Sequence, residues 1–356
     1  MGLVELGWNA FFEESFERHR QEGLAPARVV REHRELYAVR GVGDELAARI
    51  SGRMRYNAQG RSDFPAVGDW VAIDPRIGES QATIHALLPR KTVFSRKVAA
   101  FKTEEQVVAA NVDTVFLVTS LDRDFNPRRL ERYLAVAWES GASPVILLNK
   151  MDLCEDAQPF IDQAESVAFG APVYAVSAAQ RKGLDHLEAR LSPGMTAALL
   201  GSSGVGKTTL INALAGSDSL RVGPVREDDG RGRHVTTWRE LILLPAGGVI
   251  IDTPGMRELQ LWADDSQVDG SFEDVVQIAA RCRFRDCEHE SEPGCAVRAA
   301  LEDGTLDQGR YRSFVKLRRE VAYLAARRDQ RERLRQARRW KQIARWSRQR
   351  REFEKR

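Results

Sequence analysis

The sequence has 356 residues, of which 43% are hydrophobic and 29% are charged, a composition that excludes a disordered chain and indicates a folded globular protein. The chain is longer than chains built around one ordinary hydrophobic core, so we expect two or three domains. The longest apolar runs are far too short to cross a bilayer. The net charge of +3 is unevenly spread, because the segment from Lys316 to the C-terminus carries 17 Lys and Arg against 5 Asp and Glu.

The N-terminal segment is acidic and lacks the basic region of a secretory signal, so the cytoplasm is the expected compartment. Residues 8–20 predict a short helix with Phe11, Phe12 and Phe16 available to one face.

From residue 27 to about residue 90 the pattern changes to short strands separated by Gly, Pro and Asp turn signals. Strands at this spacing are typical of a small β-barrel or sandwich, and the segment "ELAARISGRM" is one of those predicted strands. An OB-fold barrel, whose open face often binds nucleic acid, fits the length. Residues 89–97 then predict a basic linker.

Beyond this linker, apolar strands and amphipathic helices alternate with the period of a parallel βαβ sheet. A helix is expected over residues 128–141, and "RELILLP" and "GGVIIDTPG" predict a hairpin turning at Ala246-Gly247-Gly248. The buried strands are expected over residues 112–121, 143–150, 171–178 and 196–202.

The stretch "LLNKMDL" ends one of these strands with Asn149, Lys150 and Asp152, the N-K-x-D element with which GTPases read guanine. The Asp152 carboxylate can accept hydrogen bonds from N1–H and N2–H₂ of guanine, a donor pair that adenine lacks, which disfavours an ATPase or kinase. Asn149 can tie the base to the phosphate loop, and the Lys150 stem can lie against the ring. Ser177 and Ala178, in "VSA", resemble the second guanine-contacting loop. The alternative is an ordinary strand-to-helix turn.

The octapeptide "GSSGVGKT" matches the phosphate-loop pattern G-x-x-x-x-G-K-[ST], and it follows an apolar strand and precedes a helix expected over residues 209–215. Its backbone N–H groups and the helix N-terminus suit a bound phosphate. Lys207 should reach the β- and γ-phosphates, and the Thr208 hydroxyl should ligate Mg²⁺. The alternative is a glycine-rich turn without a ligand. The candidate nucleotide-binding residues here are Gly201, Ser202, Ser203, Gly204, Val205, Gly206, Lys207, Thr208 and Thr209.

The stretch "IDTPGM" supplies Asp252 for Mg²⁺, through water, and Gly255 for an N–H contact with the γ-phosphate. The Gly- and Arg-rich stretch "GRGRHVTTWREL" lies between the phosphate loop and this element. Thr236 and Thr237 within it are candidates for the threonine that senses Mg²⁺ and the γ-phosphate, with a solvated loop as the alternative.

Met256 stands where signalling GTPases commonly have a glutamine that orients the attacking water. Because methionine cannot do so, we expect slow hydrolysis by the protein alone, and a partner could add about 10³–10⁵-fold. His234 is the candidate for handling the water, with Arg233 as an alternative charge donor. The candidate catalytic residues are therefore Lys207, Thr208, His234, Thr236 and Thr237.

Three of the four cysteines lie in one short window, "CRFRDCEHESEPGC", with a histidine between them. Three thiolates and one imidazole form a closed tetrahedral set suited to a structural Zn²⁺, and free buried cysteines beside a surface histidine are the alternative. The predicted zinc ligands are Cys282, Cys287, His289 and Cys295. Cys154 stands alone and is expected to be a packing residue.

The C-terminal segment predicts a helix packed on its own domain through Phe314, Leu317, Val321 and Leu324. Past residue 327, arginines dominate, interleaved with tryptophans, a pattern suited to RNA phosphates and exposed bases. A solvated helix or a coiled coil is the alternative.

The elements stand in an unusual order, base-reading first and phosphate-reading second, and in this the sequence resembles the circularly permuted GTPases. The sequence contains the motifs "FPAVGDWV", "NKMDL", "GSSGVGKTTLIN", "GRGRHVTT" and "DTPG" as well as the cysteine window. In these motifs it is similar to the ribosome small-subunit-dependent GTPase A family over nearly the whole chain. The resemblance implies an OB-fold domain (1–92), a permuted GTPase domain (93–268) and a zinc-binding helical domain (269–356).

The resemblance also implies the ligands and partners: GTP or GDP, Mg²⁺, one structural Zn²⁺ on the same four residues, ribosomal RNA and the small ribosomal subunit, whose late maturation the family serves. We expect a monomer that does not enter a membrane. Two alternatives remain: an RNA-binding assembly factor in which hydrolysis only resets binding, and a permuted GTPase acting on the large subunit. Because the second switch leads directly into the C-terminal domain, its movement should reach that domain.

Overall fold

The structure is a computed structural model that describes residues 2–33, 36–76, 79–98, 104–122, 125–168, 170–216, 239–252, 272–284, 287–289, 292–312, 314–315 and 318–319. The chain divides into two compact units, residues 1–260 and 261–356, and each is described by itself. Across these described ranges, every helix is too short or too polar to cross a membrane.

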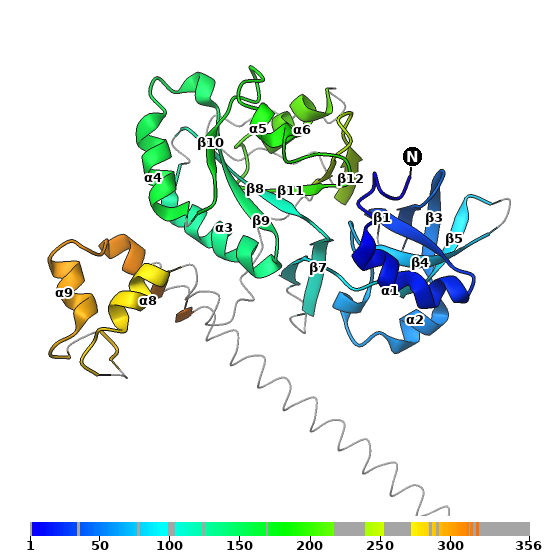
Figure 1. The fold of residues 1–356 in the computed structure, drawn as a ribbon, viewed down its shortest axis with the longest axis horizontal. Helices are drawn as coiled ribbons and strands as arrows, with labels where there is room; N and C mark the ends of the chain where they lie inside the picture. The colour runs from blue at the N-terminus through cyan, green and yellow to red at the C-terminus, as the bar shows by residue number, and fades with distance from the viewer. Residues whose placement is uncertain are drawn as a thin grey trace, which may run out of the picture. The chain divides into compact units, whose positions relative to one another are not determined.

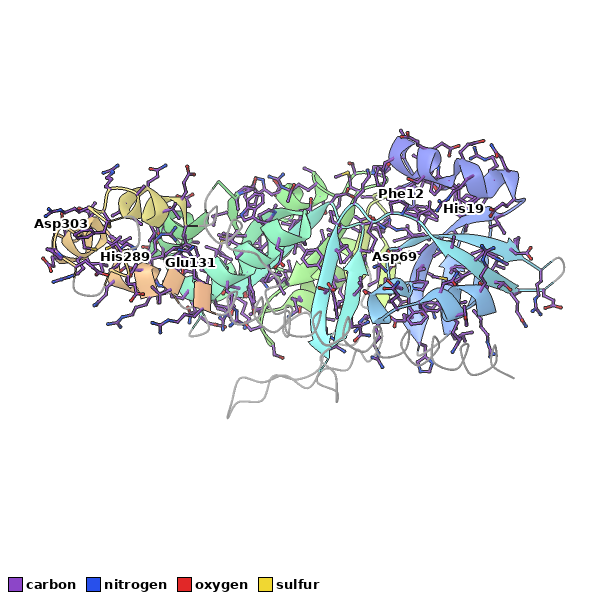
Figure 2. The ribbon with its side chains drawn as sticks, turned by 90° about the horizontal axis from the view of Figure 1, so that it is seen from below. Phe12, His19, Asp69, Glu131, His289 and Asp303 are labelled. Carbon is purple, nitrogen blue, oxygen red and sulfur yellow. The ribbon has the colours of Figure 1, made fainter. Side chains whose placement is uncertain are left out.

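The predicted N-terminal helix is present as α1 (Ala10–Gln21), which begins where the side chain of Asn9 accepts a hydrogen bond from the Phe11 N–H. Phe12 (labelled in Figure 2) is buried between the helix and the barrel. Phe16, four residues on along the same helix face, is buried in the same cluster. Phe11 lies 100° away around the helix and stays 39% exposed. Of the three phenylalanines expected to be available to one face, Phe12 and Phe16 share it, and Phe11 does not.

The N-terminal strands form a closed five-stranded barrel, as predicted for an OB-fold. The strand order is β1-β2-β3-β5-β4, with β4 pairing back onto β1 and β3 parallel to β5 (Figure 1). The strands are β1 (Ala25–His33), β2 (Leu36–Arg40), β3 (Glu45–Ile50), β4 (Trp70–Pro75) and β5 (Gln81–Leu87).

Two predicted features of this region differ in the structure. The segment "ELAARISGRM" does not continue as a strand, because the Ser51 hydroxyl accepts from the Met54 N–H and starts the helix α2 (Gly52–Asn57), which is followed by the 3-10 turn η1 (Arg61–Asp63). The predicted basic linker contains strand β6 (Val93–Val98), which pairs with β7 (Glu104–Ala110). Phe94, only 1% exposed, explains why this basic run still forms a strand.

The central part of the chain forms the predicted parallel sheet, in the order β10-β9-β8-β11-β13-β12, with only β12 antiparallel to its neighbour. The strands are β8 (Thr114–Ser120), β9 (Ser143–Asn149), β10 (Val173–Ala175), β11 (Thr196–Leu200), β12 (Arg239–Leu243) and β13 (Val249–Asp252). The β12–β13 hairpin turns at the predicted glycines.

Helices cover both faces of this sheet (Figure 1). Helices α5 (Asp185–Glu188) and α6 (Lys207–Ala215) pack in one apolar cluster with β8, β9 and β11, while α3 (Pro127–Ser140) and α4 (Gln158–Ala168) pack against each other on the opposite side. Helix α6 begins at Lys207, two residues before the predicted start, because Gly206 itself is the N-cap. A 3-10 turn, η2 (Met151–Leu153), follows β9.

The second unit contains α8 (Glu273–Ala279) and α9 (Ala296–Glu302) around a small core. Phe272 packs on Phe314, and the buried Arg310 guanidinium donates two hydrogen bonds to the Asp274 carboxylate, at 2.5 and 2.6 Å. Phe314 is buried as predicted, whereas Leu317, Val321, Leu324 and the basic segment beyond them lie outside the described residues.

Candidate nucleotide site and cysteine cluster

The glycine-rich loop connects the central strand β11 to helix α6, as the phosphate-loop pattern predicts. Gly204 and Gly206 have φ angles of +79° and +93°, which side-chain-bearing residues rarely adopt. A Cβ on Gly206 would lie 2.3 Å from Nδ2 of Asn149, and one on Gly201 would lie 2.2 Å from the Val118 carbonyl oxygen. These glycines are therefore required by close packing against neighbouring strand ends, independently of any ligand.

Lys207 stands at the first position of α6 and folds back over the loop. Its ammonium group donates to the carbonyl oxygens of Gly201 (2.8 Å) and Ser202 (2.6 Å). The charge is thereby held at the mouth of the loop, where a phosphate oxygen would compete with these carbonyls. Val205, one of the predicted nucleotide-binding residues, is fully buried, so it could contact a nucleotide only through its backbone.

Asn149, at the end of β9, connects its own loop with the phosphate loop and with the loop that contains Ala178. It is only 2% exposed; its Nδ2 donates to the Val205 carbonyl (2.8 Å) and its Oδ1 accepts from the Ala178 N–H (3.0 Å). The predicted tie between base-reading element and phosphate loop is present as a direct protein contact, and it brings Ala178 into the same cluster.

Lys150 adopts the left-handed region, with φ at +67°, and its ammonium forms an ion pair with Asp122 (2.9 Å). Asp122 also accepts from the Ser120 hydroxyl (2.8 Å). Sequence reasoning missed Asp122, although an acidic residue two positions past a buried strand, at the carboxyl edge of the sheet, is a signal that could have found it.

Asp152 is exposed on η2, where a base could reach its carboxylate. One oxygen accepts from the Ser177 hydroxyl, and that hydroxyl accepts from the Gln180 N–H (3.1 Å). Ser177 is fully buried, and its hydroxyl fixes the orientation of the Asp152 carboxylate. Its predicted contact with the nucleotide stays a prediction.

Asp252 ends β13 and is the candidate magnesium carboxylate. Burial raises its pKa to about 6 although Lys207 acts in the opposite direction, and its Oδ2 atom is buried with no hydrogen-bond partner among the described residues. A desolvated, unsatisfied carboxylate oxygen near a phosphate loop fits a hard divalent cation, which prefers oxygen ligands. The Thr208 hydroxyl, at the start of α6, would ligate this cation directly, and Asp252 would hold it through water.

The remaining predicted residues lie outside the described part of the chain. They are His234, Thr236, Thr237, Gly255 and Met256, together with Arg233.

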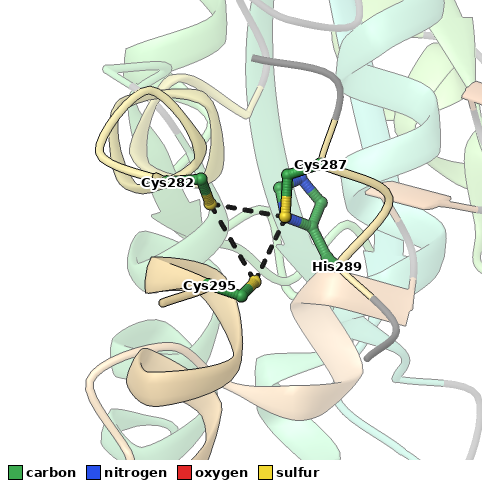
Figure 3. A group of neighbouring side chains, drawn as sticks. All are labelled: Cys282, Cys287, His289 and Cys295. Atoms are coloured by element: carbon green, nitrogen blue, oxygen red, sulfur yellow. Dashed lines mark hydrogen bonds between the residues drawn. The ribbon is translucent and has the colours of Figure 1, made fainter. Parts of the chain in front are cut away.

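The four predicted metal ligands come together in the second unit, with their ligand atoms all within 4.8 Å of one another (Figure 3). The Nδ1 atom of His289 lies 3.5 Å from the Cys282 sulfur and 3.4 Å from the Cys295 sulfur, and these two sulfurs are 3.9 Å apart. A tetrahedral Zn²⁺ with ordinary bond lengths requires separations of about 3.5 Å for sulfur to nitrogen and about 3.8 Å for sulfur to sulfur. The separations among Cys282, His289 and Cys295 therefore match those of a zinc site, and Cys287 lies close enough to be its fourth ligand.

Backbone N–H groups at the start of α9 donate to the sulfur atoms of Cys295 and Cys282. Cys295 is its N-cap and accepts from the Arg298 N–H (3.4 Å). Burial by itself would raise the pKa of Cys282, but the N–H groups of Val297 and Ala296 donate to its sulfur and bring its pKa below the ordinary value. Gly294, at φ +78°, makes the turn that brings Cys295 back to the cluster.

Cys154 lies outside this cluster and is not a core packing residue, contrary to expectation. It is partly exposed, and its thiol donates to the Asp156 carbonyl (3.2 Å).

Comparison with known proteins identifies one family across the whole chain. The model of the RsgA GTPase family matches residues 87–262. A protein of Opitutus terrae named "Small ribosomal subunit biogenesis GTPase RsgA" is 49% identical over 364 residues, covering 99% of each chain. A protein of Oceanobacillus iheyensis with the name "Small ribosomal subunit biogenesis GTPase RsgA 1" is 47% identical over 319 residues, covering 89% of this chain and 91% of that one.

Two solved structures share the fold. YjeQ from Thermotoga maritima, 26% identical, superposes with a TM-score of 0.62 over 84% of this chain and 99% of that one. YloQ, described as a circularly permuted GTPase, superposes with a TM-score of 0.57 at 24% identity, over 84% of this chain and 95% of that chain. The predicted permuted order is confirmed.

Proposed function

The chain belongs to the RsgA GTPase family and is a GTP hydrolase, and on this premise we propose that it acts in the late maturation of the small ribosomal subunit, which stimulates its hydrolysis. The observation that carries the proposal is the end-to-end similarity to a small-subunit biogenesis GTPase, 49% identical with 99% of each chain covered. The protein would act in the cytoplasm, as a monomer.

Recognition of GTP is assigned to the loops that Asn149 joins. Asp152, oriented by Ser177, would accept from N1–H and N2–H₂ of guanine, and Lys150, held by Asp122, would lie against the ring. The loop from residue 201 to residue 209, with Ala178 beside it, would hold the phosphates through backbone N–H groups.

In hydrolysis, Lys207 would leave the Gly201 and Ser202 carbonyls and bind the β- and γ-phosphates. Mg²⁺, held by Thr208 and Asp252, supplies charge neutralisation on those phosphates when bound. Gly255 would donate its N–H to the γ-phosphate, and Thr236 or Thr237 would sense that group. His234 would orient the attacking water, since Met256 cannot, and hydrolysis would be slow until the small subunit stimulates it.

The barrel carries a surface suited to single-stranded RNA. Tyr56 on α2 is 90% exposed, which is unusual for a large aromatic side chain. The sequence has no Asp or Glu between Glu45 and Asp63, and four arginines lie exposed in that stretch: Arg49, Arg53, Arg55 and Arg61. Stacking on the ring and pairing with phosphates favour RNA of the small subunit as the partner.

The second unit would hold one structural Zn²⁺ on Cys282, Cys287, His289 and Cys295, without an open position for catalysis. The domain boundaries proposed remain 1–92, 93–268 and 269–356.

The genetic test is a strain that lacks this protein. We expect incompletely matured small subunits to accumulate, large subunits to be normal, and the wild-type protein to restore maturation. If a Thr208→Ala variant that binds but does not hydrolyse GTP restored maturation fully, the alternative in which hydrolysis only resets binding would be favoured. Accumulation of immature large subunits alone would overturn the proposal.

A further inference from the structure

Strand β12 is shared between the GTPase sheet and the barrel. One edge pairs with β13 and the other with β1, so that, in the described part of the chain, the two sheets form one continuous sheet (Figure 1). The register places Arg31 opposite Glu240 and Glu240 opposite Asp252. A single row of residues therefore runs from the barrel to the candidate magnesium carboxylate.

Strand β4 pairs with the first half of β1, and β12 pairs with its second half. Within the described residues, the register of β1 with β12 covers Arg31 and Glu32 of β1. The side chains that cross this junction add to the stability of the backbone pairing.

A nearly buried ion pair crosses the junction. Nη1 of Arg239 lies 3.0 Å from Oε2 of Glu32, and these side chains are 12% and 18% exposed. Burial raises the pKa of Glu32 and lowers that of Arg239, so each charge depends on the other for compensation. The neighbouring pair between Arg31 and Glu240 (3.1 Å) is more than 40% exposed on both sides and should contribute little.

A second contact fixes the barrel against the start of β11. The guanidinium of Arg28, 1% exposed on β1, donates to Thr196 Oγ1 (2.9 Å), to the Asn111 and Gly68 carbonyls (both 3.1 Å) and to the Leu6 carbonyl. These hydrogen bonds hold β1 against the start of β11, next to its pairing with β12.

We propose that Glu32 and Arg239 are positioning residues of the GTPase: through this pair the barrel holds β12, and β12 holds β13 with Asp252. A partner bound at the barrel then changes the magnesium site by way of two paired strands. The inference rests on the proposed function, because it explains how binding of the small subunit would stimulate hydrolysis through β12 and β13.

The test uses charge reversal and its rescue in the full-length protein. Glu32→Arg and Arg239→Glu each place like charges opposite one another, whereas the double variant restores an opposite-charge pair. The matched control is Glu79→Arg, which disrupts an exposed barrel pair with Arg76, 60% and 53% exposed. If the reversals fail to fold, Glu32→Gln removes the charge while keeping the size.

We expect each single reversal to lower the subunit-stimulated kcat about tenfold, with the KM for GTP nearly unchanged. The double variant should recover most of the lost kcat. The Glu79→Arg control should have the kcat of the wild type. Amide hydrogen exchange supplies a readout independent of turnover. Peptides covering residues 239–252 should lose protection in the single variants and regain it in the double variant.

Equal stimulation of wild type and single variants, or unchanged exchange protection, would overturn the inference. If wild type itself is not stimulated by small subunits, the proposed function fails, and the exchange experiment still decides whether this pair holds β12 and β13.

Discussion

The side-chain amide of Asn149 donates to the carbonyl of Val205 at 2.8 Å across 56 residues of chain. Its strand, β9, is the neighbour of β8, and β8 is the neighbour of the phosphate-loop strand β11. All three strands are parallel, so their carboxyl ends meet at one edge of the sheet whatever their order in the chain. Permutation therefore leaves the guanine and phosphate elements in contact.

Replacing Asn149 with Ala should weaken binding of GTP and GDP alike. The change leaves the Val205 carbonyl and the Ala178 N–H without their partner, which costs about 1–3 kcal/mol of stability. Because the two loops are then no longer held together before binding, each nucleotide should bind several-fold more weakly. Isothermal titration with both nucleotides measures it. Gln158→Ala, which removes an exposed amide that pairs with Asp162, is the control, and equal affinities in the two variants would contradict the assignment.

Asp252 should make the metal-free protein less stable as the pH rises. Its pKa is about 6 in the folded state against 3.8 ordinarily, so the penalty for burying the charge is absent below about pH 4 and complete above about pH 6. Asp252→Asn should raise the melting temperature in EDTA at pH 7.5 and have little effect at pH 4. The full penalty is on the order of 3 kcal/mol.

Added Mg²⁺ with GDP should reverse this difference, because the cation satisfies the buried carboxylate. A melting temperature that is unaffected by Asp252→Asn at both pH values would refute the account of this residue.

Removing zinc should unfold the second unit and spare the first. The described part of that unit has short helices around a small core, so the metal should supply much of its stability, since structural zinc contributes about 10–16 kcal/mol in small metal-binding domains. Cys287→Ser should lose the bound zinc and the exchange protection of residues 272–312. Cys154→Ser, outside the cluster, should keep one zinc per chain; loss of zinc in that variant too would point to a different ligand set.

The exposed surface formed by Tyr56 and by Arg49, Arg53, Arg55 and Arg61 should bind single-stranded RNA. This binding should weaken as the salt concentration rises. Tyr56→Ala should weaken binding of a fluorescent RNA oligonucleotide by about 1–3 kcal/mol through lost stacking. Arg53→Ala should reduce the slope of log K against log salt by about 0.7, one phosphate contact. Arg76→Ala, exposed at the end of β4, serves as the control. If all three variants bound RNA as wild type does, the surface would be assigned wrongly.

Local patterns in the sequence predicted those parts of the site that depend on short-range geometry. The phosphate loop, the N-K-x-D turn and the cysteine spacing each bring their own ligands within a few residues, so residue type and spacing suffice to recognise them. The barrel and the parallel sheet followed in the same way from strand periodicity and turn residues.

Contacts between distant segments could not be predicted. The ion pairs of Asp122 with Lys150 and of Glu32 with Arg239 depend on which strands become neighbours, and the sequence pattern does not encode that order directly. The hydrogen bond from the Ser177 hydroxyl to Asp152 likewise depends on the fold, since it joins residues on the loops after two neighbouring strands. The charges of the segment that forms β6 predict a linker, and they hide the buried Phe94 that makes it a strand.

The central claim, a GTPase whose productive partner is the small ribosomal subunit, is tested most directly by steady-state GTP hydrolysis with the purified protein alone, with isolated small subunits and with isolated large subunits. We predict slow hydrolysis alone and stimulation of about a hundredfold or more by small subunits only, within the range that partners supply to GTPases. Equal turnover in all three conditions, or stimulation by large subunits instead, would contradict the claim.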